Sequence, residues 1–410
     1  MNWSELKKLS LAHGDAFYLL DSGQFEQNYQ SLLDAFNKFY PDVQIGYSYK
    51  TNYIPHLCKL IDKLGGYAEV VSEMEYALAQ KIGVSRNRII FNGPNKSKSA
   101  FTDAMLNGAT VNLDSTRDLN MFVEIARSNP NKQFDITIRT NFSIGNDSVS
   151  RFGFDTDGEV FRNAIDIIEQ AENTSLAGFH CHFPDRDLQS YGRRASVLIE
   201  LAKKYFPNKA PKHLNIGGGY FGRLPDTLKN AYDLTQVSYE EYGQIIGDQL
   251  LAAYPDPNNS PTLFIEPGTA IVADTMSFVT EVIDVKTVQG RNIATVSGSI
   301  FNISPTARTQ HLPFVVHKKD SQGTSEHLTE FDIGGFTCIE GDYLSRNVDA
   351  DIQVGDFLEY SNVGSYSIVM KPPFILPNVP IVSRCNINGE HEIHKERETM
   401  EYIFQNFHGT

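Results

Sequence analysis

The pattern of hydrophobic and polar positions changes period repeatedly between about residue 24 and about residue 278. Short runs of β-branched and aromatic residues, which predict buried strands, alternate with segments in which apolar residues recur every three or four positions, which predicts amphipathic helices. The eight predicted strands are Gln44–Lys50, Tyr67–Ser72, Arg88–Gly93, Thr110–Asp114, Phe134–Asn141, Leu176–Phe183, His213–Gly217 and Thr262–Glu266.

A helix is predicted between most of these strands. Ile54–Leu64 carries its apolar residues on one face and is ended by the glycine pair that follows it. Ser72–Gly83 begins with Ser72 and Glu75 at the spacing of a capping box. Two longer helices of the same kind are Gln189–Phe206 and Tyr239–Tyr254. Repeated strand–helix units predict a parallel sheet, and eight of them in about 250 residues predict a closed (β/α)8 barrel of the TIM type.

After residue 278 the predicted strands follow one another without helices between them. They are Ser277–Thr287, Asn292–Gly298, Phe314–His317 and Asp356–Ser361. This pattern predicts a separate domain that resembles a β-sandwich or β-barrel. We therefore expect two domains: a barrel over residues 24–278, and a β-domain that joins residues 1–23 to residues 279–410.

Composition and charge exclude several classes of protein. Of the 410 residues 41% are hydrophobic and 21% are charged, as in ordinary globular chains, and the formal net charge is -14. Because an acidic surface repels nucleic-acid phosphates and anionic lipid, we expect neither nucleic acid nor a membrane as a partner. No apolar run approaches the roughly 20 residues of a membrane helix, and the first residues carry no secretion-type stretch. The four cysteines show no CxxC spacing, so we expect no disulfide framework, no metal site and a reducing, cytoplasmic location.

Candidate chemistry lies where the predicted barrel strands end, because the loops at the carboxyl ends of such strands carry the catalytic groups. The residues at those positions are Lys50, Glu69, Arg139, His182, Gly217, Gly218, Gly219 and Glu266. A lysine, an imidazole, a glycine-rich loop and a carboxylate are thus expected at one mouth of the barrel.

For each of these residues a structural role is an alternative to the chemical one. Desolvation would make the Lys50 amine nucleophilic enough to form an imine, although a lysine that ends a strand can also be a surface residue. Gly217–Gly219 would let backbone N–H groups approach a phosphate, but it equally fits a tight turn. Glu266 would keep a pyridine nitrogen protonated, or be a partly exposed carboxylate. His182 would stack on a cofactor ring, or be a hydrogen-bonded core histidine.

Taken together, these residues resemble the fold-type III pyridoxal-phosphate decarboxylases, the group of diaminopimelate and ornithine decarboxylases, over nearly the whole chain. The matching motifs are Tyr47–Asn52, Ala68–Glu75, Ile89–Gly93, Ser150–Gly153, His180–His182, Leu214–Gly219, Glu266–Gly268, Gly335–Asp342 and Gly364–Tyr366. The resemblance implies a barrel of the alanine racemase type and pyridoxal 5'-phosphate as cofactor. It also implies a homodimer with shared active sites, in which the β-domain of one subunit completes the site of the other.

The resemblance further implies a role for individual residues. Lys50 would hold the cofactor as an imine, His182 would stack on its ring, and Glu266 would pair with the ring nitrogen. Further cofactor contacts would come from Glu69, Arg139, Gly217, Gly218, Gly219, Gly268 and, from the β-domain, Tyr366. Cys338 of the β-domain would donate a proton to the reacting carbon. The substrate-binding residues that we expect are Asp342 and Glu340, with Arg308 as an anion contact.

The chain also departs from the family. Where the family has a glycine–serine turn whose hydroxyl binds phosphate, this chain has Phe183–Asp187, and whether Asp185–Arg186 replaces that contact is left open. Two arginines that hold phosphate or a distal carboxylate in relatives are replaced by Thr269 and Ser304. These losses argue against meso-diaminopimelate as the substrate.

The expected function is therefore decarboxylation of an amino acid or amino-acid conjugate, with release of CO2 and an amine. A basic amino acid and a siderophore or antibiotic intermediate both remain open as substrates. A racemase of the same barrel fold is an alternative, but racemases pair the ring nitrogen with an arginine and use a tyrosine base, unlike Glu266 and Cys338. A non-catalytic homologue is a second alternative, against which Lys50, Gly217–Gly219 and Glu266 argue.

Overall fold

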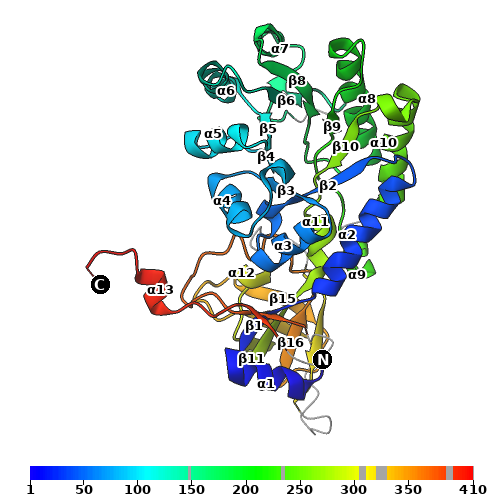
Figure 1. The fold of residues 1–410 in the computed structure, drawn as a ribbon. Coiled ribbons are helices and arrows are strands. Elements are labelled where there is room, and N and C mark those ends of the chain that lie inside the picture. The colour runs from blue at the N-terminus through cyan, green and yellow to red at the C-terminus, as the bar shows by residue number, and fades with distance from the viewer. Residues whose placement is uncertain (146–148, 232–235, 304–310, 320–329, 385–390, 410) are drawn as a thin grey trace. The chain divides into compact units, whose positions relative to one another are not determined.

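The computed structural model describes residues 1–145, 149–231, 236–303, 311–319, 330–384 and 391–409 (Figure 1). The chain divides into two compact units. The first consists of Met1–Phe25, Gly222–Thr235 and Val272–Thr410, and the second of Glu26–Phe221 and Gln236–Ile271.

The second unit contains a closed barrel of eight parallel strands, which confirms the predicted fold. The strands are ordered β5-β4-β3-β2-β10-β9-β8-β6, and β6 pairs again with β5 to close the ring. Their bounds are β2 (Val43–Ser48), β3 (Tyr67–Val70), β4 (Ile89–Phe91), β5 (Thr110–Leu113), β6 (Phe134–Asn141), β8 (Thr174–His180), β9 (His213–Asn215) and β10 (Thr262–Ile265), while the short β7 (Phe154–Asp155) pairs with β6.

Helices alternate with these strands along the chain and surround them (Figure 1). They are α2 (Ser22–Asn37), α3 (Pro55–Lys63), α4 (Glu73–Lys81), α5 (Lys98–Leu106), α6 (Thr116–Ser128), α7 (Glu159–Gln170), α8 (Leu188–Tyr205), α10 (Tyr239–Ala253) and α11 (Thr269–Val272), with single 3-10 turns at Tyr49–Thr51, Arg86–Arg88 and Pro257–Asn259. Six of these helices begin with a side-chain cap: the residue before the helix accepts a hydrogen bond from the backbone N–H three positions on. These caps are Asp21, Ser72, Ser97, Ser115, Asp187 and Ser238.

The predicted capping box at Ser72 is only half formed. The Ser72 hydroxyl accepts from the Glu75 backbone N–H at 3.2 Å, as expected. The Glu75 carboxylate, however, accepts from the N–H of Val71 at 2.8 Å rather than from that of Ser72. The carboxylate is thereby drawn back toward the end of β3 and buried, with the side chain only 5% exposed.

Seven of the eight predicted barrel strands extend too far at their carboxyl ends, and only Phe134–Asn141 ends where it was expected. Four of the seven concern candidate site residues. Lys50, His182, Gly217 and Glu266 lie in the loops that follow β2, β8, β9 and β10, rather than in the strands themselves. The physical reason is that the backbone turns away from the ladder at these points. Lys50 lies in a 3-10 turn, and Gly217 has a left-handed φ of 74°. All four residues therefore still belong to the carboxyl-end mouth of the barrel.

The first unit contains a nine-stranded, mostly antiparallel sheet. Its main path runs β15-β14-β12-β11-β1-β17-β18, while β16 pairs with both β11 and β13. The strands are β1 (Ala16–Leu20), β11 (Met276–Val288), β12 (Arg291–Val296), β13 (Phe314–His317), β14 (Phe331–Gly334), β15 (Tyr343–Val348), β16 (Phe357–Tyr360), β17 (Ile381–Ser383) and β18 (Ile393–Lys395). The helices are α1 (Trp3–His13), α9 (Asp226–Ala231), α12 (Ile300–Ile303) and α13 (Met400–Phe404), with a 3-10 turn at Ala273–Thr275.

The amino-terminal strand β1 lies inside this sheet. It pairs antiparallel with β11 and parallel with β17, with Tyr18 opposite Phe278 on one side and Ile381 on the other. Leu6 and Leu9 of α1 pack on a buried cluster that includes Phe17 of β1. The first 20 residues thus contribute a central strand and a covering helix to this sheet.

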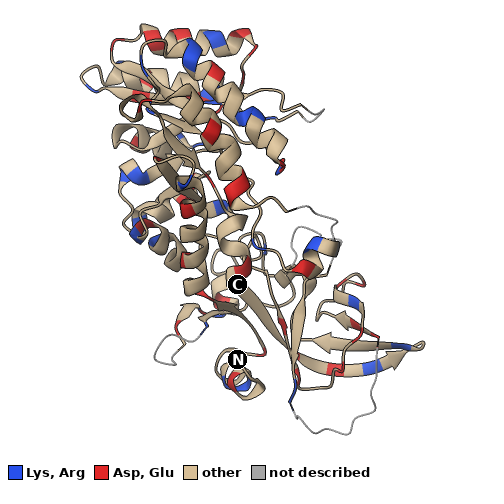
Figure 2. Ribbon diagram, turned by 90° about the vertical axis from the view of Figure 1, so that its right-hand side faces the viewer, with Lys and Arg blue, Asp and Glu red and all other residues tan. Residues whose placement is uncertain are grey.

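The charged residues of the chain are dispersed. Figure 2 shows acidic and basic residues interspersed along the helices, in keeping with a net charge of -14 spread over 410 residues. Among the described residues, no helix combines the length and the hydropathy that crossing a membrane requires.

Candidate active site

A pocket of about 250 Å³ opens at the carboxyl ends of the barrel strands. It brings together five of the residues singled out from the sequence: Lys50, Glu69, Arg139, His182 and Glu266. The other residues that line it are Val71, Asn92, Gly93, Pro94, Arg151, Phe152 and His180. A lysine, two carboxylates, two imidazoles and two guanidinium groups therefore share one small volume.

Lys50 and Glu69 form an ion pair at the edge of this pocket. The Lys50 Nζ lies 2.6 Å from Glu69 Oε2 and 3.4 Å from the Ser48 hydroxyl. The Lys50 side chain is 34% exposed, whereas that of Glu69 is fully buried. The Lys50 amine is thus accessible from the pocket and donates a hydrogen bond to the buried Glu69 carboxylate.

Glu266 is the second buried carboxylate of the pocket. Its Oε1 accepts from the amides of Asn92 at 2.8 Å and Asn215 at 2.7 Å, and its Oε2 accepts from His180 Nε2 at 3.2 Å. Burial by itself raises the pKa of Glu266, but the attraction of His180 and Lys50 and the bonds from His180 and Asn92 bring it below its usual range. The carboxylate therefore stays ionised at neutral pH.

Asn92 connects the two carboxylates. Its amide nitrogen also donates to Glu69 Oε1 at 2.9 Å, and its oxygen accepts from Asn112 at 2.6 Å. An unbroken chain of contacts thus runs from Lys50 through Glu69, Asn92 and Glu266. Sequence analysis missed Asn92, His180 and Asn215 as site residues, although each stands in a motif quoted above.

His182 lies two residues beyond the end of β8 and is partly exposed in the pocket. Burial, followed by the positive charges of Lys50 and Arg139, brings the pKa of its imidazole well below the usual value. The ring is therefore neutral. Its Nδ1 accepts from the backbone N–H of Gly218 at 2.9 Å, which places the ring proton on Nε2.

Two arginines flank the aromatic ring of Phe152. Arg139 donates to the carboxylate of Asp114 at 3.1 Å, and its guanidinium carbon lies 4.6 Å from the centre of the Phe152 ring. Arg151 lies 4.2 Å from the same ring centre and is exposed. Arg139 is thus fixed by a buried partner, whereas Arg151 is an exposed residue of the pocket lining.

The predicted glycine loop lies beside the pocket and contacts the residues that line it. A Cβ at Gly217 would come within 2.3 Å of the Cys181 carbonyl oxygen, and one at Gly218 within 2.2 Å of that of Glu266. At Gly268 a Cβ would lie 2.0 Å from Thr51 Oγ1. These positions therefore exclude any side chain.

The backbone of this loop also leaves donors open. The N–H groups of Gly219 and Gly268 have no hydrogen-bond acceptor within the described ranges, whereas that of Gly218 is taken by His182. The loop segments after β9 and β10 thus form a cradle that offers N–H groups and lacks side chains, a geometry suited to a phosphate.

The remaining predicted residues lie in the first unit. Cys338 carries an exposed thiol, Glu340 is exposed, and Tyr366 is partly exposed with a left-handed φ of 67°. Asp342 is buried. Arg308 falls outside the described residues, as does Ser304.

The Asp342 carboxylate is engaged by four donors of its own unit. They are the Ser299 hydroxyl (3.0 Å), the Ile300 N–H (2.8 Å), and the N–H (3.1 Å) and hydroxyl (2.6 Å) of Thr337. Asp342 thus anchors the segment that carries Cys338, and its contact with a substrate stays a prediction.

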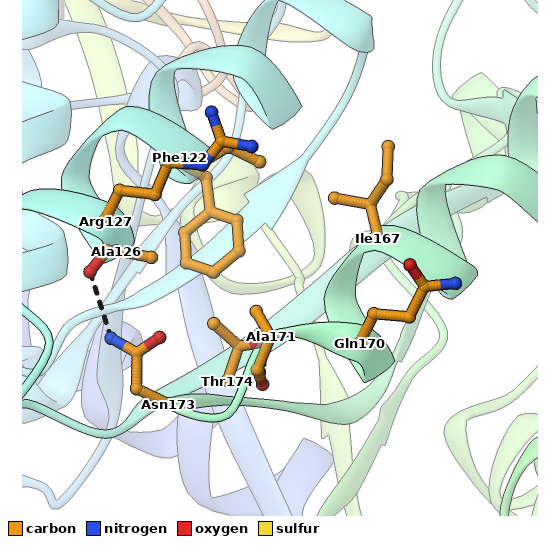
Figure 3. A pocket seen from close by; sticks show the side chains of 9 residues that line it. Phe122, Ala126, Arg127, Ile167, Gln170, Ala171, Asn173 and Thr174 are labelled. Atoms are coloured by element: carbon orange, nitrogen blue, oxygen red, sulfur yellow. Dashed lines mark hydrogen bonds between the residues drawn. The ribbon is translucent and has the colours of Figure 1, made fainter.

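A second hollow, of about 320 Å³, lies between α6 and α7 near the start of β8 (Figure 3). Phe122 and Ile167 line it, and the Asn173 amide donates to the Ala126 carbonyl at 3.0 Å, drawn as a dashed line. Arg127 is its one charged lining residue. Because it adjoins the amino end of a barrel strand and holds no acid–base pair, it is not the candidate site.

Comparison with known proteins bears on the family and the fold of the chain. Residues 24–273 match the family described as "Pyridoxal-dependent decarboxylase, pyridoxal binding domain". The chain is 25% identical to diaminopimelate decarboxylase of Aquifex aeolicus, over 98% of this chain and 93% of the relative. It is 24% identical to L-glutamyl-[BtrI acyl-carrier protein] decarboxylase of Niallia circulans, over 98% of this chain and 96% of the relative. The crystal structure of diaminopimelate decarboxylase from M. jannaschii shares the fold with a TM-score of 0.84 at 21% identity, over 98% of this chain and 93% of that one.

Proposed function

The chain belongs to the pyridoxal-dependent decarboxylases, and from this premise we propose that it removes the α-carboxylate of an amino acid or amino-acid conjugate as CO2. The observation that carries the proposal is the convergence of Lys50, Glu69, His182 and Glu266 on one pocket at the carboxyl ends of the barrel strands. Pyridoxal phosphate, when bound, supplies a pyridinium ring that accepts the electrons of the breaking bond.

The residues present fit this cofactor. Lys50 offers an accessible amine for covalent attachment, and Glu266 offers an ionised carboxylate that would pair with the ring nitrogen. His182 offers the flat face of a neutral ring. The open N–H groups of Gly219 and Gly268 would receive the phosphate.

The chain's own groups would then manage binding and protons. Glu69, 2.6 Å from Lys50 Nζ, would accept a hydrogen bond from the Lys50 amine whenever that amine is free of the cofactor. Glu266 would keep the ring nitrogen protonated throughout, because its pKa lies below its usual range. Cys338, supplied by the β-domain of a second subunit, would protonate the α-carbon after CO2 has left. A racemase is not favoured, since it would need a cation where this pocket holds Glu266.

For the substrate, we propose a basic amino acid or a conjugated intermediate rather than meso-diaminopimelate. Thr269 stands where the diaminopimelate enzymes have an arginine, and a distal carboxylate buried without a cation is costly. The relative from Niallia circulans, by its name, decarboxylates a glutamyl group held on a carrier protein. Conjugates therefore belong in the set to be tested.

The testing experiment is a substrate panel. The cofactor-loaded protein is incubated with L- and D-amino acids, diaminopimelate and glutamyl conjugates, and released CO2 is measured. Lys50→Ala serves as the blank, and we expect it to lose both the imine absorbance and CO2 release. A borohydride-reducible cofactor adduct on another lysine would refute the assignment of Lys50. Diaminopimelate should be turned over at least about tenfold less well than the best substrate, equivalent to about 1.4 kcal/mol.

A further inference from the structure

Arg194 is a fully buried cation in α8. Its Nε donates to the Ser190 hydroxyl at 3.2 Å. Its terminal nitrogens donate to the carbonyl oxygens of Gly218 (3.0 Å), Phe183 (3.0 Å) and Asp185 (2.5 Å). Among the described residues its hydrogen-bond acceptors are thus one hydroxyl and three backbone carbonyls, and none is a carboxylate.

The three carbonyls belong to two neighbouring loops. Residues 183–185 follow β8, and Gly218 belongs to the glycine loop that follows β9. Tyr191, one turn earlier on α8, also donates to the Gly218 carbonyl at 2.9 Å, and its ring centre lies 4.1 Å from the Arg194 guanidinium carbon. One face of α8 therefore fastens both loops together directly behind the open N–H group of Gly219.

Within the described part of the chain, no carboxylate oxygen forms a hydrogen bond with Arg194. Neutral carbonyls and an aromatic face offset the loss of water only in part, so a buried guanidinium is expected to have a counter-charge nearby. The carboxylates of the pocket are already engaged: Glu266 by His180, and Glu69 by Lys50. A doubly charged group bound at the glycine loop would supply the missing negative charge.

We propose that Arg194 is a positioning residue for the phosphate of the cofactor. It holds the loops at 183–185 and 217–219 in place through their carbonyls, and its positive charge balances the phosphate without touching it. Arg186, another arginine near these loops, stacks on an aromatic ring instead: its guanidinium carbon lies 5.3 Å from the centre of the Phe221 ring. This inference rests on the proposed binding of pyridoxal phosphate at the barrel mouth.

The test compares two ligands that differ only in the phosphate. Apoprotein is titrated with pyridoxal 5'-phosphate and with pyridoxal, and imine absorbance gives a Kd for each. The ratio of the pyridoxal Kd to the pyridoxal-phosphate Kd measures the contribution of the phosphate. Arg194→Gln keeps hydrogen-bond donors but loses the charge, and Arg194→Lys keeps the charge but loses the planar fork. Arg193→Gln is the matched control, because Arg193 is the adjacent, exposed arginine of the same helix.

We expect the Kd ratio to fall at least about tenfold in R194Q and to stay within about threefold of the native value in R194K, where tenfold is about 1.4 kcal/mol. R193Q should match the native protein. A folded R194Q with the native ratio would overturn the proposal, since a purely structural role would weaken both ligands alike. If R194Q does not fold, R194K alone tests the proposal. A tenfold fall of the Kd ratio in R194K, despite the retained positive charge, would then overturn the proposal. Absence of any imine band in the native protein would instead refute the proposed function.

Discussion

At the scale of single residues, the surroundings of Glu266 show how a buried carboxylate is kept charged. Two asparagine amides and one imidazole bind its two oxygens, and Lys50 adds a positive charge in the same pocket. Bonds to an ionised acceptor are the stronger kind, so they outweigh the loss of water at this depth.

Glu266→Gln should remove the negative charge that we propose for pairing with the ring nitrogen. We expect decarboxylation to slow at least about a hundredfold, equivalent to about 2.7 kcal/mol of activation free energy, while the fold is retained. Glu359→Gln is a matched control, because Glu359 is also a largely buried carboxylate beside a histidine, His317, but lies outside the site. CO2 release and circular dichroism check both variants, and similar rate losses in the two would count against the role of Glu266.

Glu75 illustrates a carboxylate with fewer compensating partners. Burial raises its pKa from 4.5 to about 7, against the opposing bond from the Val71 N–H. A raised pKa in the folded chain means that this group's stabilisation is complete below about pH 4.5 and is lost as the pH rises through 7.

Glu75→Gln should therefore flatten the pH dependence of stability in that window. At pH 8 the variant should match or exceed the native protein, by no more than about 3 kcal/mol. Glu73→Gln, an exposed position of the same helix, should keep the native pH profile. Denaturant unfolding between pH 4.5 and pH 8 measures both, and a native-like slope in Glu75→Gln would contradict the raised pKa.

The sequence predicted most of the charged members of the site but not their partners. Lys50, Glu69, Arg139, His182 and Glu266 were singled out because they stand in or at the ends of predicted strands, whereas Arg151, which also lines the pocket, was not. Asn92, His180 and Asn215 were missed because an amide or imidazole inside a strand motif has no distinctive chemistry until the strands are placed side by side.

At the scale of elements, the loops after the barrel strands are shaped by close backbone approach. Gly217 has both a left-handed φ and no room for a Cβ, which would come within 2.3 Å of the Cys181 carbonyl oxygen. Gly83, at the end of α4, has a left-handed φ of 93° but open space around its missing Cβ. At Gly83 a side chain would meet only backbone strain, whereas at Gly217 it would meet both backbone strain and a steric clash.

Gly83→Ala should cost about 1–2 kcal/mol of unfolding free energy through its backbone conformation alone. Gly217→Ala should cost about 2 kcal/mol more, because the Cβ also pushes into the neighbouring loop. It should also weaken binding of pyridoxal phosphate, whereas Gly83→Ala should not. Denaturant unfolding and imine absorbance test both points; equal losses of stability would show that the loop yields to the added carbon.

Element prediction succeeded for the repeated strand–helix units of the barrel, including the three-residue strands β4 and β9. All eight barrel strands were identified, since each is followed by a readable loop or helix. Their carboxyl ends were placed too late because β-branched and aromatic residues continue into the loops. The predicted capping box is only half formed, because the Glu75 carboxylate accepts from the Val71 N–H instead of the Ser72 N–H.

At the scale of the whole molecule, the proposed dimer gives a direct prediction. If Cys338 acts on the site built around Lys50 of a second subunit, mixing inactive Lys50→Ala with inactive Cys338→Ala should restore part of the activity. A mixed dimer would contain one intact site and one doubly defective site. Activity after proven subunit exchange checks this, and no recovery would argue against shared sites.

The sheet of the first unit was only partly predictable. Four of its strands were foreseen, but β1, β14, β15, β17 and β18 were not. β17 and β18 are three residues long, too short to show a period, and several partners are distant in sequence. Such pairings depend on the assembled sheet rather than on local sequence.

The central position of β1 has a consequence for synthesis on the ribosome. Synthesis of β1 ends at Leu20, whereas its partner β11 begins only at Met276 and its partner β17 only at Ile381. The first partner therefore follows about 256 residues later. At roughly 5–20 residues per second, this fully buried, apolar strand waits for some tens of seconds before its first partner exists. The barrel, by contrast, has all its strands once residue 265 has been made. The nascent chain therefore carries an unpaired hydrophobic strand after the barrel is already able to fold, and until β11 is made this strand is open to pairing with other chains.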